Sequence, residues 1–291
     1  KVIIAPAMNS NMWNHPATRE NILRLQQRGH TVIEPAEGLL ACGVTGPGRL
    51  AEPATIIAGV LNTIESQPLR RDMEGETFLI SAGPTQEPLD PVRYISNRSS
   101  GKMGYALAEA AAARGARVIL VSGPVSLTPP DSVEVVPVRT AVEMHDRIFD
   151  HLQEATVIIK SAAVADYHVV NVPAQKLKKT ATRMTLDLDP TPDILAELGQ
   201  KKGDRLLIGF AAETDNLVAE ARRKLQTKGC DMIVANLVNQ ENSGFESDMN
   251  RVTLVKKTGE TIEIPPALKR SIADSILDES LKLRLALYAS E

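Results

Sequence analysis

The sequence has 291 residues, of which 43% are apolar, and a formal net charge of −3, values that suit a folded chain with a real core and roughly two domains. Its 33 Lys and Arg against 36 Asp and Glu argue against nucleic-acid and membrane-surface binding, which require a basic excess, and no apolar run is long enough to span a bilayer. The presence of only two cysteines, Cys42 and Cys230, and the lack of a visible signal peptide argue against a disulfide scaffold and predict a reducing, cytoplasmic setting.

Residues 1–68 are expected to form a first unit. The chain opens at Lys1 directly into the apolar run Val2–Ala5, a buried-strand pattern that needs neighbouring strands, so we expect the sequence to be a fragment that lacks an N-terminal part. The elements predicted next are a helix over 16–28, a short strand over 30–35, a glycine-rich loop over 42–49 and a helix over 53–66.

Residues 77–291 are expected to form a second unit, after a polar linker over 69–76. Strands alternate with helices, and Thr140 with Glu143 forms the capping box of one helix. This alternation predicts an α/β fold with a doubly wound, Rossmann-like parallel sheet, which binds ligands at the carboxyl ends of its strands. The expected strands cover 78–83, 117–122, 156–161, 206–211 and 231–235, and the expected helices cover 103–114, 140–154 and 216–228.

The C-terminal part differs from this alternation. Two strand patterns over 251–257 and 261–265 flank a Thr-Gly-Glu turn and predict a hairpin. An amphipathic helix is expected over 266–288. Its apolar residues Leu281, Leu285 and Tyr288 suit either the core or an interface between subunits.

The loop over 83–104 is the first candidate site, because it joins the end of a strand to the start of a helix. Ser99, Ser100 and Gly101 would place backbone amides and hydroxyls at the helix N-terminus, which suits a phosphate group. An ordinary helix cap with turn glycines is nearly as good an explanation. The loop matches neither the P-loop nor the Rossmann glycine fingerprint.

Three further segments carry side chains suited to a nucleotide. Lys160–Tyr167 follows a strand, and its small residues would admit a flat ring while Asp166 could hold a ring amine or a metal ion; a tight turn with an Asp cap is the alternative. Residues 175–179 contain alternate lysines, which point to one face of an extended chain. Such a charge run is usually a solvated surface, but beside a phosphate site it would bind the phosphate. Lys224 and Lys228 share one face of a helix, where an anion would offset their repulsion, although a helix C-terminus also favours lysine by itself.

The first unit contains a candidate reactive cysteine. Cys42 lies in the glycine-rich loop, where a thiol with a tuned pKa can act as a proton donor or a nucleophile. Cys230 stands at the entrance to a strand and is expected in the core.

These motifs resemble a known family. Residues 6–13 (PAMNSNMW) and 41–49 (ACGVTGPGR) resemble phosphopantothenoylcysteine decarboxylase, a flavodoxin-like α/β domain. The second unit resembles phosphopantothenate–cysteine ligase almost end to end. The order is that of the bifunctional coenzyme A biosynthesis enzymes, and the matching segments are GPTQEPLD (83–90), SNRSSGKMG (96–104), SAAVADY (161–167), KLKK (176–179), GFAAET (209–214) and VANLV (234–238) followed by GF (244–245).

The resemblance implies specific substrates and roles. In the decarboxylase, which uses FMN, Cys42 would be the proton donor, and Asn9 with Met12 would bind the substrate. In the ligase, which joins 4'-phosphopantothenate to cysteine with CTP and Mg²⁺, Asn97 would act on the reaction intermediate and Lys176 on the triphosphate. The residues implied at the nucleotide are Lys160, Ser161, Ala162, Asp166, Lys176, Asp193, Ile194, Leu195, Ala196, Phe210, Lys224 and Lys228.

The family pattern also implies ligase dimers and decarboxylase trimers, and leaves the metal ligands unknown. A flavin-phosphate loop and a catalytic histidine precede the PxMN element in the family, and neither His15 nor His30 stands in for that histidine. Only the C-terminal part of the decarboxylase domain is therefore expected here, with an incomplete FMN site.

Two other functions are alternatives to ligation and decarboxylation. A nicotinamide oxidoreductase on the same sheet would need a glycine fingerprint after its first strand and an acidic residue after its second, where Ser122, Gly123 and Pro124 stand instead. A non-catalytic nucleotide-binding homologue would have lost the lysines and Cys42, which are all present.

Overall fold

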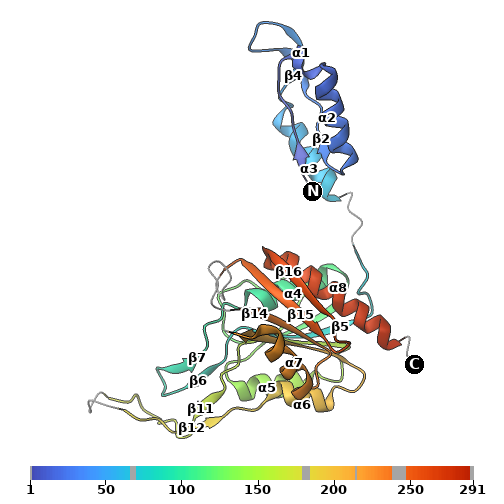
Figure 1. Ribbon diagram of the computed structural model, residues 1–291. Helices are drawn as coiled ribbons and strands as arrows, with labels where there is room; N and C mark the ends of the chain where they lie inside the picture. Colours follow the sequence, from blue (N-terminus) through green and yellow to red (C-terminus); the bar gives the residue numbers. More distant parts are fainter. Residues whose placement is uncertain (1, 66–69, 179–183, 214, 238–246, 289–291) are drawn as a thin grey trace. The chain divides into compact units, whose positions relative to one another are not determined.

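The computed structural model describes residues 2–65, 70–178, 184–213, 215–237 and 247–288 (Figure 1). Lys179 and the GF segment at 244–245 lie outside the described residues, as does the side chain of Tyr288. Contacts between Cα atoms divide the chain into a first unit, Lys1–Leu69, and a second unit, Arg70–Glu291. Within the described residues, no helix is both long and apolar enough to cross a membrane.

The described residues of the first unit, 2–65, form three helices and two small sheets. Strands β1 (Ile3–Ile4) and β2 (Thr31–Val32) pair in parallel, and β3 (Ala36–Leu39) pairs antiparallel with β4 (Thr45–Arg49). The segment 42–49, expected as a loop, is therefore largely the second strand of a hairpin. Its turn passes through Gly43, whose φ of 80° suits glycine. The helices are α1 (Ser10–Trp13), α2 (Pro16–Gln27) and α3 (Pro53–Glu65).

An eight-stranded sheet forms the centre of the second unit, in the order β16-β15-β14-β13-β10-β5-β8-β9. Six adjacent strands are parallel, with the doubly wound order 3-2-1-4-5-6 that turns back between β5 and β10. The hairpin β15–β16 adds two antiparallel strands at the β14 edge, as expected. The bounds are β5 Thr77–Ala82, β8 Arg117–Ser122, β9 Glu134–Pro137, β10 Val157–Lys160, β13 Leu206–Glu213, β14 Met232–Leu237, β15 Met249–Lys256 and β16 Thr261–Leu268.

Helices cover both faces of this sheet (Figure 1). One aliphatic core lies under α4 (Lys102–Ala113) and α8 (Lys269–Tyr288), and the other lies under α5 (Ala141–Asp150), α6 (Ile194–Lys201) and α7 (Leu217–Thr227). The Thr140–Glu143 capping box is present at α5. Leu281 packs against the first core, whereas Leu285 is exposed.

Several short elements occupy segments that are expected as loops or for which the sequence predicts no element. β6 (Gln86–Pro88) pairs with β7 (Tyr94–Ser96), and β11 (Tyr167–Val169) pairs with β12 (Leu188–Pro190). These two hairpins project from the same side of the second unit (Figure 1). The edge strand β9 and helix α6 were also missed. Three- and four-residue strands are too short to show a period of two, so nothing local predicts them.

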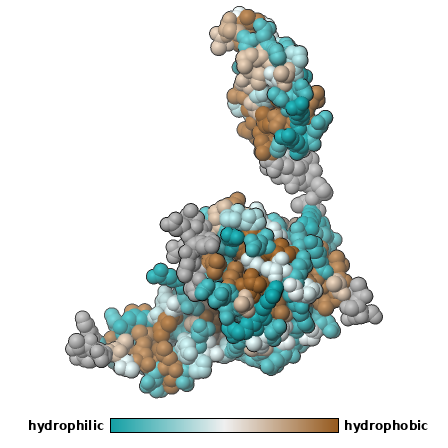
Figure 2. All heavy atoms as spheres, viewed as in Figure 1, coloured by the Kyte–Doolittle hydropathy of each residue, from teal (hydrophilic) through white to brown (hydrophobic). Residues whose placement is uncertain are grey.

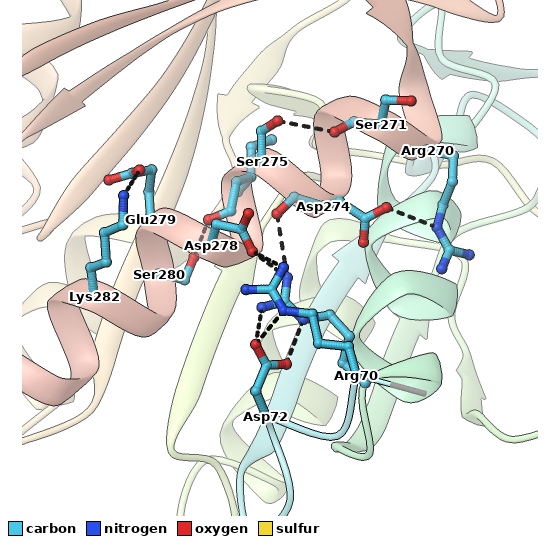
Figure 3. A network of polar contacts seen from close by, with 12 residues as sticks. Arg70, Asp72, Arg270, Ser271, Asp274, Ser275, Asp278, Glu279, Ser280 and Lys282 are labelled. Carbon is cyan, nitrogen blue, oxygen red and sulfur yellow. Dashed lines mark hydrogen bonds and ion pairs between the residues drawn. The ribbon is translucent and has the colours of Figure 1, made fainter. Parts of the chain in front are cut away.

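The segment 70–76, expected as part of a linker, packs on the second unit. Met73 is 1% exposed within the core under α4 and α8. Arg114, at the end of α4, donates to both carboxylate oxygens of Asp72 at 2.8 Å and to Asp278 of α8 at 2.8 Å. Arg70 bridges the same two carboxylates at 2.7 Å (Figure 3). The polar residues that resemble a linker are thus partners of a buried arginine.

We expect Arg114→Met to lower the free energy of unfolding by about 3 kcal/mol, because it leaves partly buried carboxylates without their main partner. The Arg114 hydrogen bond, ahead of its charge and that of Arg70, holds the pKa of Asp72 below its ordinary value, against the effect of burial. A carboxyl with a lowered folded pKa stabilises above its unfolded pKa and loses that contribution as pH falls. Chemical denaturation of the wild type between pH 7 and pH 3 should therefore show a steeper loss below about pH 4 than the variant does.

The matched control is Arg117→Met, which removes an arginine with a half-exposed side chain paired with Glu134 and Glu154. Surface pairs contribute up to about 1 kcal/mol, so this change should have little effect. Equal losses from the two variants would show that the buried network does not anchor residues 70–76.

Candidate functional site

A cavity of about 420 Å³ opens at the carboxyl ends of β10, β13 and β14, beside the point between β5 and β10 where the strand order turns back. This is the position expected for ligands in a doubly wound sheet. Residues of the predicted phosphate loop, of the segment after β10 and of β13 and α7 line it together. The predicted site residues in its wall are Asn97, Ser99, Ser100, Gly101, Ser161, Ala162, Asp166, Phe210 and Lys224.

The phosphate loop enters α4 through Gly101, which has a φ of 75°. A Cβ at Gly101 would meet Val125 at 2.8 Å, and one at Gly104 would meet the Cβ of Ala82 at 2.5 Å. The first turn of α4 therefore lies directly against the end of β5, and its N-terminus faces the cavity, which favours an anion there.

Asn97 is held at the rim of this cavity by the loop that follows β10. Its Nδ2 donates to the backbone oxygen of Val164 at 2.8 Å and, at 3.4 Å, to that of Ala163. The amide is thus oriented by two carbonyl groups and keeps its own oxygen for another partner.

A second cavity of about 420 Å³ shares five of its wall residues with the first, including Asp166, Phe210 and Lys224. It adds Lys160, Lys228, Asp193, Ile194 and Leu195. Lys224 donates to the backbone oxygen of Phe210 at 2.8 Å, and Lys228 pairs with Asp193. The structure therefore brings three lysines together around one side of the cleft, from β10, from α7 and from the residue that follows α7.

The charge of Lys160 and of Lys224 is poorly compensated by acidic side chains. The pKa of Lys160, which is 8% exposed, is lowered to about 7, first by burial and then by the nearby Lys224, whereas Asp193 acts in the opposite direction. Burial also lowers the pKa of Lys224. Burial is the largest effect on the pKa of Asp193 and acts to raise it, but the hydrogen bonds from Lys228 and the Ala196 N–H and the nearby lysine charges together outweigh it, so the pKa is lowered. A bound polyanion would favour the charged state of Lys160 and Lys224.

The lysine side of the cleft is built from two helices in direct backbone contact. A Cβ at Gly199 of α6 would lie 1.9 Å from the carbonyl oxygen of Lys228, at the end of α7. Asp193 caps α6 by accepting from the backbone N–H of Ala196. The two ends of the Lys228–Asp193 pair are therefore carried by helices that touch without any intervening side chain.

Two predicted nucleotide residues lie outside both cavity walls. Ala196 is in the first turn of α6, where its contribution is the N–H that caps the helix. Lys176 is exposed, on the long connection between β11 and β12, and lines neither cavity. Lys176 therefore stands apart from Lys224 and Lys228 in the described chain, and its meeting with them over a bound triphosphate stays a prediction.

Other polar residues of the wall were not predicted. Lys102, Asn236, Asn250 and Lys269 all line the first cavity. Lys102 and Asn236 fall within motifs quoted for the family resemblance, so their positions gave a signal. Lys269 is 7% exposed at the start of α8, and its approach to the cavity depends on the β15–β16 hairpin, which sequence spacing does not reveal.

In the first unit, Asn9 and Cys42 meet although 33 residues separate them. Asn9 Nδ2 lies 3.1 Å from Cys42 Sγ, and its Oδ1 accepts from Asn11 at 2.8 Å to cap α1. The close passage of Gly48, whose Cβ would lie 2.0 Å from the Met8 oxygen, holds the two segments together. Met12 is exposed, as is Cys42, whereas Cys230 is buried as expected.

The β11–β12 hairpin and its connection carry an exposed apolar surface. Figure 2 shows hydrophobic residues gathered on this projection. The large apolar side chains exposed there are Tyr167, Val170, Val172, Met184 and Leu188. Patches of this kind commonly mark interaction sites.

Among the residues that the structure describes, no three His, Cys, Asp or Glu side chains are grouped to hold a metal ion. Asp166 and Asp193 are carboxylates in the cavity walls. Mg²⁺ commonly binds through one or two carboxylates together with substrate phosphates, and this donor set fits that mode.

Comparison with known proteins places the chain in a family. Residues 73–283 match the DNA/pantothenate metabolism flavoprotein C-terminal domain, and residues 1–65 match the flavoprotein family. The chain is 47% identical over 279 residues to the coenzyme A biosynthesis bifunctional protein CoaBC of Bacillus subtilis, a match that covers 96% of this chain and 68% of the relative. It is also 43% identical over 285 residues to a cysteine/cysteine sulfinic acid decarboxylase from an unknown prokaryotic organism, covering 97% of this chain and 79% of that protein.

A solved structure agrees with these sequence matches. The crystal structure of the C-terminal domain of coenzyme A biosynthesis bifunctional protein CoaBC superposes with a TM-score of 0.64 at 44% identity, covering 73% of this chain and 97% of that one. With a domain match over most of its length and relatives above 40% identity, the chain belongs to the coenzyme A biosynthesis bifunctional CoaBC family.

Proposed function

We propose that the second unit ligates 4'-phosphopantothenate to cysteine at the expense of CTP, as a step of coenzyme A biosynthesis. The observation that carries this proposal is the convergence of Lys160, Lys224 and Lys228 on a cleft whose other side is the N-terminus of α4. Such a cleft attracts a polyphosphate from both sides, by the lysine charges on one and by the helix N-terminus on the other. The relatives are coenzyme A biosynthesis proteins by name, which supports this assignment. The acyl and amine substrates are those that the family resemblance implies.

Ligation requires two transfers. A carboxylate oxygen of 4'-phosphopantothenate attacks the α-phosphorus of CTP, and the bond to pyrophosphate breaks to give an acyl-cytidylate. The cysteine amine then attacks the acyl carbon, loses a proton and expels CMP. Activation is necessary because a free carboxylate is a poor acyl donor.

The residues of the cleft stabilise charge in the first transfer. Lys160, Lys224 and Lys228 would bind anionic oxygens of the nucleotide, while Ser99, Ser100 and Gly101 would donate to phosphate from the opposite side. Ser161, Ala162 and Phe210 would border the base or ribose. Mg²⁺, when bound, would neutralise phosphate charge, with Asp166 and Asp193 as the available carboxylates.

Asn97 is proposed to act in the second transfer. We expect Asn97→Asp to accumulate the acyl-cytidylate, because a carboxylate cannot donate to the Val164 and Ala163 oxygens that orient the amide and would repel the anionic intermediate. Rapid acid quench with labelled CTP, followed by chromatography, measures the trapped species. Kinetics identical to the wild type would remove Asn97 from the mechanism.

The overall proposal is tested by following pyrophosphate release with CTP, 4'-phosphopantothenate and cysteine. Release that depends on both the acyl substrate and the nucleotide is the expected result. Omitting cysteine should leave a single turnover, since the first transfer needs no amine. A parallel reaction with ATP decides the nucleotide, and full activity with ATP alone would contradict the assignment of CTP.

For the first unit we propose a part in FMN-dependent decarboxylation of the ligated product. FMN, when bound, supplies the two-electron chemistry of that reaction. The Asn9–Cys42 contact fits such a site, because it places an amide that can bind a substrate carboxylate beside a thiol that can return a proton. Met12, exposed on α1, would contact the same substrate.

We further propose that the ligase units form dimers, that the decarboxylase units form trimers, and that the protein works in the reducing cytoplasm. The exposed apolar side chains of the β11–β12 projection support burial against another subunit. The free thiol of Cys42 supports a reducing compartment. Light scattering coupled to gel filtration would measure the oligomeric state.

A further inference from the structure

Asp90 lies in the turn between β6 and β7, and its side chain is fully buried, with 0% exposed. Its Oδ1 accepts from the backbone N–H groups of Val92 and Arg93 at 2.8 Å each. Its Oδ2 accepts from Arg93 Nε at 3.0 Å and Nη2 at 2.6 Å. These bonds explain how the turn itself is held.

The same pair also binds a residue far away in the sequence. The backbone N–H of Leu177 donates to Asp90 Oδ2 at 3.1 Å, and Arg93 Nη2 donates to the backbone oxygen of Leu177 at 3.2 Å. Both polar groups of one peptide residue are therefore bound by one carboxylate–guanidinium pair. The β6–β7 turn does not need these two bonds for its own structure.

Leu177 stands between Lys176 and Lys178. Alternate side chains of an extended segment point to the same side, and here the leucine is half-buried while both lysines are exposed. Fixing the N–H and the oxygen of Leu177 fixes the peptide planes on either side of it. The direction in which Lys176 projects is thus set by Asp90 and Arg93.

We propose that Asp90 is a positioning residue for Lys176, holding the backbone of Leu177 so that the Lys176 ammonium group is presented to the triphosphate. This inference rests on the proposed ligation. Asp90 itself touches no substrate in this scheme, and its effect on catalysis passes through the lysine.

The substitution Asp90→Asn tests this with little change in shape. The amide keeps one acceptor oxygen but loses the negative charge that attracts Arg93. Its NH₂ group is a donor and faces other donors, so the hydrogen bonds on that side are lost. The matched control is Asp72→Asn, which removes a carboxylate paired with Arg114 and has no contact with Leu177.

The first measurement is independent of activity. Trypsin cleaves after lysine, and the bond that follows Lys176 contains the Leu177 nitrogen that Asp90 binds. In the full-length chain below its melting temperature, Asp90→Asn should raise the initial cleavage rate at this bond about tenfold, since local opening governs such cleavage. Asp72→Asn should leave that rate unchanged. Equal rates in the wild type and Asp90→Asn would overturn the clamp.

The second measurement is a double-mutant cycle with Lys176→Gln, followed by pyrophosphate release. Asp90→Asn should lower kcat about tenfold or more while the KM for CTP changes less than about threefold, because the cavity walls are untouched. If Asp90 acts through Lys176, the kcat of the double variant will equal that of Lys176→Gln alone. Without the Lys176 ammonium group, the Asp90→Asn change has no catalytic group to displace.

If the fold-decreases in kcat of the two single variants multiply in the double variant, the positioning role is overturned. Faster proteolysis of Asp90→Asn with unchanged kcat would overturn it as well. If the wild type releases no pyrophosphate, the proposed ligation fails and the catalytic part of this inference fails with it. The proteolysis result would still decide whether the clamp exists, so the two failures are distinguishable.

Discussion

Lys176→Gln is expected to lower kcat about a thousandfold while the melting temperature stays the same. A unit charge about 4 Å from another contributes about 4 kcal/mol at an effective dielectric constant of 20, and each 1.4 kcal/mol or so is a factor of ten in rate. Lys176 is exposed and makes no hydrogen bond or ion pair within the described chain, so its removal leaves the fold without a lost contact. Pyrophosphate release and circular dichroism melting measure the two properties.

Lys178→Gln is the matched control, because this lysine carries the same charge on the same side of the same segment. We expect its kcat to stay within about fivefold of the wild type, which is less than 1 kcal/mol in barrier height. Equal losses in the two variants would mean that charge density, and not the position of Lys176, matters. Near-normal turnover in Lys176→Gln would exclude it from the reaction.

Lys160→Met is expected to stabilise the protein and weaken nucleotide binding at the same time. Since the pKa of buried Lys160 is lowered to about 7, keeping it charged at neutral pH costs about 4 kcal/mol relative to an unfolded lysine. A methionine of similar length removes this cost and fills the same space. The apparent affinity for CTP should fall about tenfold or more, since one cation of the cleft is lost.

The gain in stability of Lys160→Met over the wild type depends on pH. Between pH 7 and the ordinary lysine pKa the unfolded chain binds more protons at this position than the folded chain, so the wild type gains stability as pH rises through that window. The advantage of Lys160→Met should therefore be full below pH 7 and shrink toward pH 10. Urea denaturation at several pH values measures it.

Lys202→Met provides a control of opposite sign. Lys202 is also largely buried, but it pairs with Asp231 at 2.8 Å, so its removal leaves a buried carboxylate without its cation and should destabilise by about 3 kcal/mol. If both variants change stability in the same direction, the uncompensated charge of Lys160 is not the cause of its effect.

The doubly wound sheet could be predicted from the sequence because its strands are long apolar runs separated by helices with clear ends. Strands such as β5 and β8 are buried on both faces, which requires continuous hydrophobicity. The short hairpins could not be predicted, because their pairing depends on neighbours and not on a local pattern. Residues 70–76 were assigned to a linker because their partners, Arg114 and Asp278, lie 42 and more residues away.

The candidate site was predictable where functional side chains follow directly on a strand or fall on one helix face. Asp166 follows β10 closely, and Lys224 with Lys228 lies one helical turn apart. Lys269 was missed because a hairpin brings it to the cavity from the C-terminal region. The bonds from Asp90 and Arg93 to Leu177 also have no sequence signature, since they use the backbone of their partner.

The contact between Gly199 and the Lys228 carbonyl fixes the spacing of α6 and α7. Main-chain atoms already touch there, so no side chain between the two helices could be shortened to bring Lys228 nearer to Asp193. Under the proposed function, the phosphate-binding side of the cleft could change only by exchanging charged groups on a frame of fixed width. Any residue larger than glycine at position 199 would force the two helices apart.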